Sequence, residues 1–548
     1  MTLFFSFILA MFVTMSLIPF LMRSAERWRV IDMPDHRKVH SHAIPRIGGM
    51  AMVAGALIPI IMWLMPNTTV IALLCGMLVV FGFGLWDDRC DLDYRIKFFG
   101  QFLAVIIVIF YGGIRIDIIP FAGLDPVPIY ISIPLTVIFL LGITNAINLS
   151  DGLDGLAGGT TLLSFGVIAL LGYHEQDVVV LITAIAVLGS ILGFLRFNTY
   201  PARIFMGDGG SQFLGFVIGV LAVMLTQKDD SALSPALPLL LLGLPILDTL
   251  LVMGQRVYEK RSPFAPDKNH IHHKLLALGF DHYEAVFAIY IFQSILAICT
   301  YMLRYQSDAM IIGIYLSFCV LIISFFRLAY ITQWKLRYTT ERETKPLISA
   351  GIRHFRYLKK NGKVTDKCFK ISVFTVPLYL FFISLSAGNI TKDIGVLAML
   401  MFLALLLVPF LHVQWLTTGL VRVSAYLLCT FTVYVFHTSS RVTTVVDTIV
   451  VLFFVLLALC VAVGFHFSKD KDFKVTTLDF LVIFIAFLVP NLPGVQFGDE
   501  VGSAIAQLIV LYYSVELIMS NIKDKIHVMR ITEISFFLIF SINSILIK

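Results

Sequence analysis

The sequence predicts an all-α protein that crosses a membrane many times, and its composition, hydropathy and segment lengths point to this class. Of the 548 residues, 58% are hydrophobic and 14% are charged, whereas a soluble domain is about half apolar and about a quarter charged. The mean hydropathy is +0.90. The composition therefore excludes a cytosolic globular enzyme, a disordered chain and a secreted disulfide scaffold. The seven scattered cysteines have no CxxC spacing, and we interpret them as small buried hydrophobes.

Apolar segments too long for strands recur along the whole chain. In hydrocarbon such segments are helices, because every backbone group must be paired within the segment. A span takes about 20 apolar residues, and we expect about 18 spans, about 11 in a first series and about 7 in a second. The first series is 3–22, 48–66, 69–86, 99–118, 128–147, 160–172, 176–195, 210–226, 235–254, 284–303 and 308–328. The second series is 371–388, 394–412, 419–437, 445–467, 477–492, 502–520 and 532–547.

Lysine and arginine in the loops predict the orientation, because they favour the cytoplasmic side. The loop 23–47 is basic, which places the N-terminus outside, and later basic loops alternate consistently with this. The stretch 331–370 has eleven Lys and Arg against three acids. It divides the chain into a first transmembrane domain, 1–330, a basic cytoplasmic linker, 331–370, and a C-terminal transmembrane extension, 371–548. The net charge of +6 is mild and does not indicate nucleic acid as a partner.

Polar residues at membrane depth are costly, so their clusters are candidate functional sites. The first cluster is Asp87, Asp88 and Asp91, at the end of an apolar segment. Adjacent carboxylates there could bind a divalent cation or act as a base. The alternative is a solvated helix end beside Arg89, Arg95 and Lys97.

The second cluster is Asn145, Asn148, Asp151 and Asp154, which recur every three residues within NAINLSDGLDGLAGG. If this segment is helical, the four side chains share one face. Its glycines allow the backbone to approach a ligand closely. The alternative is a helix exit capped by Asp and Gly.

The third cluster contains Arg196, Asn198 and Phe205, and ends in Asp208 within a Gly-Asp-Gly-Gly-Ser turn. We expect this turn just before a helix. A helix N-terminus attracts phosphate, and a carboxylate there can hold the magnesium ion that bridges it. The alternative is an ordinary glycine-rich turn.

Two further clusters are basic. His270, His272 and His273 lie near Arg256 and Lys268, and this set suits anionic oxygen. A zinc site is the alternative, but the spacing is neither HxxxH nor HExxH; a plain loop is a second alternative. The last cluster consists of Arg37-Lys-Val-His40 and Pro45-Arg-Ile-Gly-Gly49. Taken alone, its positive charge indicates only that the loop is cytoplasmic.

All five clusters fall at the predicted cytoplasmic face. Carboxylates, cationic groups and a glycine-rich helix start at one membrane face predict a Mg²⁺-dependent site for phosphates, because a diphosphate needs cations to neutralise charge as its bond breaks. The membrane setting suggests that one substrate is a lipid.

These motifs, PRIGG, DDRCD, NAINLSDGLDGLAGG, FNTYPARIFMGDGGS and SPFAPDKNHIHH, resemble the polyprenyl-phosphate N-acetylhexosamine-1-phosphate transferases, glycosyltransferase family 4. The similarity covers residues 1 to about 330, and the HIHH form resembles the WecA/TagO branch. It implies transfer of N-acetylhexosamine 1-phosphate, usually N-acetylglucosamine 1-phosphate, from a UDP-sugar to undecaprenyl phosphate, with release of UMP. This would be the first membrane step of a cell-surface polysaccharide. The resemblance also implies Mg²⁺, with Mn²⁺ as a substitute, a site at the cytoplasmic face of the bacterial inner membrane, and a homodimer.

The candidate site residues follow from the clusters and the resemblance. The catalytic candidates are Asp87, Asp88, Asp151, Asp154, His272 and His273. The substrate-binding candidates are Lys38, Lys97, Asn145, Asn148, Asn198, Phe205, Arg256 and His270. The metal candidates are Asp208, Asp87 and Asp88.

The resemblance implies finer roles. Asp208 would bind the metal directly, with Asn145 and Asn148 beside it, and Phe205 would stack on the uracil. Asp151, Asp154 and Asn198 would line the nucleoside pocket. Asp87 would be the base that takes any remaining proton from the attacking lipid phosphate, and the three histidines with Arg256 would hold the diphosphate. Lys268 stands where this branch more often has Arg.

Two other functions compete with this one. A transporter or flippase of lipid-linked sugar places polar groups near the midplane of the bilayer; this disfavours transport for 1–330 but leaves it open for 371–548. There the candidates are His412, Arg422, His437, Arg441 and Asp447, and a structural or oligomerisation module is the alternative. A catalytically inactive scaffold is disfavoured, because the acidic and histidine motifs are intact.

Overall fold

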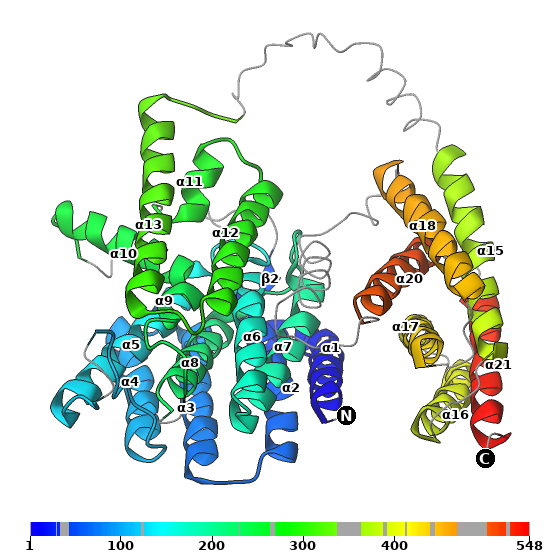
Figure 1. The fold of residues 1–548 in the computed structure, drawn as a ribbon, viewed down its shortest axis with the longest axis horizontal. Coiled ribbons are helices and arrows are strands. Elements are labelled where there is room, and N and C mark those ends of the chain that lie inside the picture. Colours follow the sequence, from blue (N-terminus) through cyan, green and yellow to red (C-terminus); the bar gives the residue numbers. More distant parts are fainter. Residues whose placement is uncertain are drawn as a thin grey trace. The chain divides into compact units, whose positions relative to one another are not determined.

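The structure is a computed structural model, and it describes the chain except residues 1, 29, 33–42, 122–124, 229–230, 263–268, 337–362, 387–391, 412–413, 439–443, 468–500, 522–525 and 547–548. The protein is an all-α polytopic membrane protein, as its sequence predicts. Its helices form two compact units, one within Met1–Glu341 and the other from Arg342 onward (Figure 1).

Among the described residues, ten helices are long and apolar enough to cross a membrane, eight of them in the first unit, and four further apolar helices are shorter. The sequence predicts about 18 spans. Part of the difference is length, because the helices over three predicted spans have only 16, 17 and 16 residues. The predicted span 477–492 lies outside the described residues.

The first unit holds thirteen helices and one two-stranded hairpin among the residues that the structure describes. The helices are α1 Thr2–Trp28, α2 Gly48–Trp63, α3 Thr68–Cys90, α4 Tyr94–Phe110, α5 Ile129–Ser150, α6 Leu156–His174, α7 Val178–Asn198, α8 Gly207–Thr226, α9 Pro238–Leu241, α10 Gly243–Tyr258, α11 Ile271–Ala277, α12 His282–Met302 and α13 Asp308–Ile331. The strands β1 Ile31–Asp32 and β2 Ile44–Pro45 are antiparallel, with Ile31 opposite Pro45.

Helix α8 is the centre of the first unit. It is buried along nearly its whole length, and α2, α3, α5 and α6 pack around it (Figure 1). Glycines make this packing close. A Cβ added to Gly84 of α3 would lie 2.5 Å from the Cα of Gly209, and one added to Gly49 of α2 would lie 2.5 Å from the amide nitrogen of Gly210. The PRIGG and GDGGS motifs therefore hold three helix ends together.

Three local predictions are wrong. The predicted span 235–254 is divided into α9 and α10 at Leu242. The four polar residues from Asn145 to Asp154 do not share a helix face, because α5 ends at Ser150 and Asp151 caps it. Asp208 does not precede a helix but lies in the first turn of α8, which begins one residue earlier.

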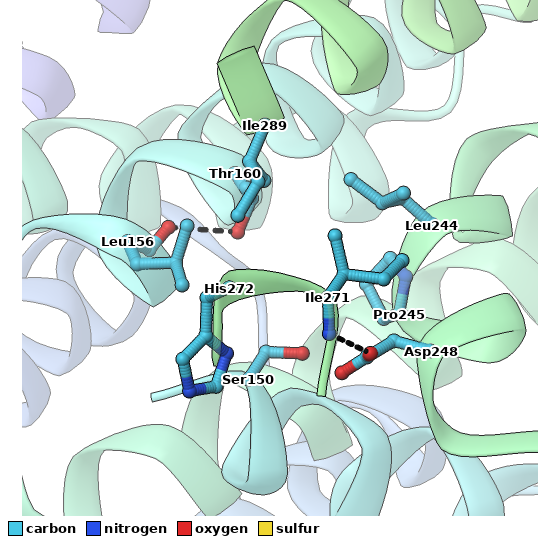
Figure 2. Close-up of a pocket in the computed structure, with 9 residues that line it drawn as sticks. All are labelled: Ser150, Leu156, Thr160, Leu244, Pro245, Asp248, Ile271, His272 and Ile289. Carbon is cyan, nitrogen blue, oxygen red and sulfur yellow. Dashed lines mark hydrogen bonds between the residues drawn. The ribbon is translucent and has the colours of Figure 1, made fainter. Parts of the chain in front are cut away.

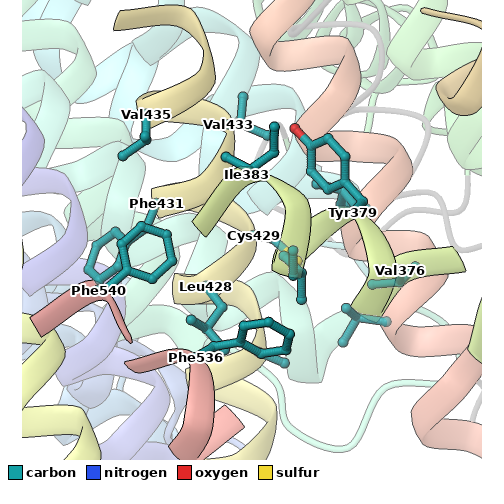
Figure 3. Packing of buried hydrophobic residues seen from close by; sticks show 14 of the residues in the cluster. Val376, Tyr379, Ile383, Leu428, Cys429, Phe431, Val433, Val435, Phe536 and Phe540 are labelled. Atoms are coloured by element: carbon teal, nitrogen blue, oxygen red, sulfur yellow. The ribbon is translucent and has the colours of Figure 1, made fainter. Parts of the chain in front are cut away.

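The second unit is a separate helical bundle with its own core. Its described helices are α15 Lys363–Ser386, α16 Lys392–Leu407, η1 Val408–Leu411, α17 Gln414–Thr438, α18 Thr444–Phe467, α20 Val501–Asn521 and α21 Ile526–Leu546. The core combines aliphatic side chains with aromatic rings: Phe431 of α17 lies 6.2 Å from Phe540 of α21 between ring centroids (Figure 3). This apolar packing is the setting for the few polar groups that the unit buries.

Candidate active site

Four helix ends meet at one end of the first unit and bring the acidic clusters together. The last turn of α3 carries Asp87 and Asp88, the first turn of α4 carries Lys97, and the last turn of α5 carries Asn148. Asp208 comes from the first turn of α8. Residues more than 100 positions apart in the sequence are thus in direct contact.

Asp88 caps the N-terminus of α8 from a neighbouring helix. Its Oδ1 accepts a hydrogen bond from the backbone N–H of Asp208 at 2.7 Å, and its Oδ2 accepts one from Gly209 at 3.0 Å. A carboxylate at this position satisfies amides that have no partner within the helix and complements the helix dipole. Gly207 has φ +70, and a Cβ there would lie 2.5 Å from Asp88 Oδ2, so the turn fits a glycine alone.

Lys97 joins the two other carboxylates. Its Nζ forms ion pairs with Asp87 and, at 3.0 Å, with Asp208 Oδ2. The other oxygen of Asp208 accepts a hydrogen bond from Asn148 Nδ2 at 3.0 Å. The Asp208 carboxylate is therefore held from two sides, while its side chain keeps 33% of its surface exposed.

Three amide side chains, those of Gln101, Gln212 and Asn145, are hydrogen-bonded to one another beside the acidic cluster. Gln101 of α4 donates to Gln212 Oε1 at 3.0 Å and accepts from Asn145 Nδ2 at 2.7 Å. The predicted neighbour of the metal, Asn145, is thus engaged one turn below the helix end. Gln101 lies inside a predicted span, and a lone amide there was the available signal.

The loop after α5 is tied to the loop after α7. Asn198 is 2% exposed; its Oδ1 accepts from the Gly155 N–H at 3.0 Å and its Nδ2 donates to the Ile204 carbonyl at 2.8 Å. Asp154 Oδ2 accepts from the Ala202 N–H at 2.9 Å. These contacts favour a positioning role over the predicted contact of Asn198 and Asp154 with the nucleoside.

Asp151 follows α5 and faces the acidic cluster. Burial raises its pKa to about 7, with further contributions from the negative charges of Asp208 and Asp154. Arg46 opposes this shift, and its guanidinium is anchored by Asp32 at 2.5 Å. The PRIGG arginine therefore belongs electrostatically to the site.

Asp248 of α10 organises the histidine motif, although the sequence analysis did not include it. Its Oδ2 lies 2.7 Å from His270 Nδ1, and its Oδ1 accepts a hydrogen bond from the Ile271 N–H at 2.7 Å. Asp248 and His270 are 7% and 5% exposed. One carboxylate thus orients the imidazole ring of His270 and fixes the start of α11. A single acid in an apolar predicted span was again the signal.

His272 packs beside the loop that carries Asp151. Its Nε2 would lie 2.3 Å from a Cβ added to Gly152, so the glycine makes room for the ring. Burial lowers the pKa of His272 to about 3, and the neighbouring His273 adds to the effect. At neutral pH the His272 ring is therefore uncharged and acts as a hydrogen-bonding group.

A cavity of about 30 Å³ lies beside these residues, between α5, α6, α10, α11 and α12. Figure 2 shows His272 and Ser150 on one side and Asp248 with its bond to Ile271 on the other. This volume suits about one water molecule. The cavity is an internal space behind the histidines and is too small for a sugar nucleotide.

The remaining candidates lie around this centre. His273 packs against His272 with the rings tilted by 43° and their centroids 4.3 Å apart, and Arg256 is 3% exposed at the end of α10. Phe205 is half-buried, and its backbone links Pro45 to Gly48, with hydrogen bonds of 2.8 Å on both sides. Lys38 and Lys268 lie outside the described residues.

Comparisons with known proteins decide the family. Residues 70–226 match the model of glycosyl transferase family 4. A probable undecaprenyl-phosphate N-acetylglucosaminyl 1-phosphate transferase of Bacillus subtilis (strain 168) is 36% identical over 302 residues, which cover 55% of this chain and 84% of that protein. This chain belongs to glycosyltransferase family 4.

Two other relatives agree. A decaprenyl-phosphate N-acetylglucosaminephosphotransferase of Mycobacterium leprae (strain TN) is 34% identical over 304 residues, 50% of this chain and 76% of the relative. An undecaprenyl-phosphate alpha-N-acetylglucosaminyl 1-phosphate transferase of Escherichia coli (strain K12) is 28% identical over 286 residues, 51% and 77% of the two chains.

The donor set of this family 4 member fits a hard divalent cation in part. Asp87 and Asp208 offer carboxylate oxygens, which Mg²⁺ prefers, and both already bind one ammonium group, that of Lys97. The oxygens of Asp88 are bonded to the start of α8 instead. Among the described residues no group of three or more His, Cys, Asp or Glu is arranged to hold a metal, so the predicted set of three acids is not gathered as one.

Proposed function

We propose that the first unit transfers N-acetylglucosamine 1-phosphate from UDP-N-acetylglucosamine to undecaprenyl phosphate. An oxygen of the lipid phosphate attacks the phosphorus that bears the sugar. The bond from that phosphorus to the bridging oxygen breaks, and UMP leaves with the electron pair. The products are undecaprenyl-diphosphate-N-acetylglucosamine and UMP. The relatives' printed names support both the lipid and the sugar.

The observation that carries this proposal is the contact of Asp87, Lys97 and Asp208 at one end of the bundle. A transferred phosphoryl group needs fixed positive charge and a base nearby. Lys97 supplies an ammonium group to a phosphate oxygen. Asp87 would take the proton from lipid phosphate that is still protonated, since its carboxylate lies beside the Lys97 ammonium group.

Magnesium is part of the proposal, and Asp208 with Asp87 would hold it. When bound, Mg²⁺ neutralises charge on the diphosphate. Asn148 and Lys97 keep the Asp208 carboxylate in a fixed orientation. Asp88 would act indirectly, because it accepts a hydrogen bond from the backbone of Asp208 and so fixes the turn that carries this residue.

The histidine motif would bind the diphosphate and the sugar end of the donor. His270 is oriented by Asp248, and His272 would donate or accept a hydrogen bond as a neutral ring. Arg256 and His273 would add contacts to the diphosphate, and Phe205 would stack on the uracil. Mn²⁺ as a substitute for Mg²⁺ and a homodimer remain parts of the proposal.

The predicted location completes the proposal. The basic loops support a site at the cytoplasmic face of a bacterial inner membrane, with the N-terminus outside. A diphosphate does not cross hydrocarbon unaided. A UDP-sugar made in the cytoplasm would therefore reach a site at the cytoplasmic face. The product would serve a cell-surface polysaccharide.

Release of UMP tests the proposal. Purified protein in detergent is incubated with undecaprenyl phosphate, Mg²⁺ and, in turn, UDP-GlcNAc, UDP-GalNAc and UDP-MurNAc-pentapeptide. We expect lipid- and Mg²⁺-dependent UMP from UDP-GlcNAc, and a loss of about 100-fold in Asp208→Asn. Asp117→Asn is the matched control, because that acid pairs with Arg115 at 2.8 Å, away from the cluster. Folded protein that releases no UMP from any donor contradicts the proposal.

A further inference from the structure

Helix α17 of the second unit carries polar side chains that meet partners on two neighbouring helices. Toward α20, Thr430 Oγ1 lies 2.6 Å from Tyr512 Oη, and His437 Nε2 lies 3.2 Å from Gln507 Oε1. Tyr426 donates a hydrogen bond to Glu516. Toward α21, Ser424 donates to Glu533. Polar contacts of this kind inside an apolar helical unit are costly and mark functional positions.

Glu533 is the most confined acid of this group. It lies two turns into α21, it is 4% exposed, and its neighbours in α21 include the core residues Phe536 and Phe537. Ser424 donates to Oε2, whereas Oε1 is buried and has no hydrogen-bond partner among the described residues. An ionised carboxylate in such a place is unfavourable unless a cation compensates it.

The core of the second unit holds a second buried oxygen without a partner among the described residues. The hydroxyl of Tyr379, on α15, is buried and accepts or donates no hydrogen bond in the part of the chain that the structure describes. Tyr379 and Cys429 belong to the same buried core cluster as Phe536 and Phe537, which follow Glu533 in α21. Figure 3 shows Tyr379 and Cys429 on the same side of the core.

Among the residues that the structure describes, the charged groups around this centre include no ionic partner of Glu533. On α17, Arg422 pairs instead with Glu516 of α20, at 3.6 Å. On α21 itself, Arg530 precedes Glu533 by one turn, but its buried Nε and Nη1 make no hydrogen bond to any described residue. The other titratable groups that face the centre are the hydroxyls of Tyr379 and Tyr512 and the thiol of Cys429.

We propose that this centre, formed by Glu533 and Ser424 at the contact of α21 with α17, binds a small monovalent cation, a proton or Na⁺. Carboxylate and hydroxyl oxygens are the donors that hard cations prefer. One positive charge would satisfy the open oxygen of Glu533 and remove the cost of its burial. The unit would then have the ion site that ion-coupled transport of a polar lipid needs, independently of the reaction in the first unit.

Carbodiimide labelling tests this site in the full-length protein in detergent. A hydrophobic carbodiimide reacts with a protonated, buried carboxyl group. The O–H of the acid adds across one C=N bond of the reagent, and the adduct rearranges to a stable N-acylurea that mass spectrometry locates. At pH 7 in Na⁺-free buffer we expect label on Glu533. Glu516 serves as the internal reference, because it contacts Arg422 and Tyr426, and we expect no label on it.

Variants make the result specific. Glu533→Gln is expected to lose this label, whereas Glu516→Gln, the matched control in the same unit, is expected to keep it. Addition of Na⁺, compared with choline, separates the two cations. If Na⁺ reduces the labelling of Glu533, and reduces it less in Ser424→Ala, the bound cation is Na⁺. If Na⁺ leaves the labelling unchanged, the bound cation is a proton. An unlabelled Glu533 in Na⁺-free buffer, in protein that unfolds cooperatively, overturns the proposal.

Discussion

Asp87 and Asp88 are neighbours in the chain but have different surroundings. Successive residues of a helix point about 100° apart, so one carboxylate meets Lys97 of α4 and the other meets the first turn of α8. The first is 3% exposed, and its Oδ1 also accepts a hydrogen bond from the Leu92 N–H at 2.7 Å. The second is used to hold Asp208 in place, so identical side chains give different effects when they are removed.

Asp88→Ala is expected to destabilise the first unit by about 1–2 kcal/mol, the typical loss for a helix cap, and to lower UMP release through Asp208. Thermal unfolding in detergent and the UMP assay measure the two effects. Asp91→Asn is the control, because that acid is exposed just after α3 and its replacement should leave both the unfolding temperature and UMP release unchanged. An unchanged unfolding temperature in Asp88→Ala would argue against the cap.

Asp248→Asn is expected to raise KM for the UDP-sugar at least about tenfold, because a hydrogen bond to a charged group contributes about 1.5–3 kcal/mol and an amide cannot accept at both of its ends. The kcat should change less, since Asp248 acts through His270. Steady-state kinetics separate the two constants. Asp281→Asn is the matched control, because Asp281 caps α12 outside the cluster. Equal kinetics in the two variants would contradict this role.

His272 predicts a pH dependence of stability. Its folded pKa of about 3 lies below the unfolded value of about 6.5. Between these values only the unfolded chain binds the proton, so the free energy of unfolding falls as pH falls, by up to about 1.4 kcal/mol per pH unit. Chemical denaturation at pH 7 and pH 5 measures it.

The comparison with His272→Gln isolates this effect, because Asp151 titrates with the opposite sign. Asp151 has a folded pKa of about 7, above its unfolded value, so its contribution is present at low pH and is lost as pH rises through 7. We expect the wild type to lose more stability than the variant between pH 7 and pH 5. Parallel losses would mean that His272 is accessible to protons.

At the scale of elements, the site depends on how closely helices approach. Gly84 and Gly82 both lie in α3, but a Cβ on Gly84 meets the backbone of Gly209, whereas one on Gly82 meets nothing within 4 Å. Backbone cannot move aside as a flexible side chain can. Gly84 therefore lets the backbones of α3 and α8 come together at the site, as Gly76 makes room for the Phe216 ring of α8 further along the helix.

Gly84→Ala is expected to cost about 1–3 kcal/mol, as overpacking of a core does, and to displace Asp88 from the start of α8. Gly82→Ala should be neutral or stabilising by up to about 1 kcal/mol, because alanine favours the helix. Unfolding temperature and UMP release are measured for both. Similar behaviour of the two variants would show that α3 and α8 are not in close contact.

At the scale of the whole molecule, all described site residues lie in the first unit, within Met1–Glu341. A chain truncated after Glu341 is therefore expected to retain Mg²⁺-dependent UMP release within about threefold of the full-length value, a difference of about 0.7 kcal/mol in barrier. Size-exclusion chromatography checks that the truncated protein is folded. Folded but inactive truncated protein would show that the second unit contributes to the reaction.

The sequence by itself determined the class and the chemistry. Apolar segments must be helical in hydrocarbon, and clusters such as Asp87-Asp88 and GDGGS stand out because polar residues are costly there. These patterns are local, so they can be read without coordinates. They also led to the family, which the relatives confirm.

Only the tertiary structure decided how these residues divide their work. Sequence spacing could not show that α5 ends before Asp151, that Asp88 caps a helix 120 residues away, or that Asp248 orients His270. Each of these depends on contacts between distant segments, and such contacts leave no periodic trace in the chain. A lone Gln101, Asp248 or Glu533 becomes interpretable only when its neighbours across the helix interface are known.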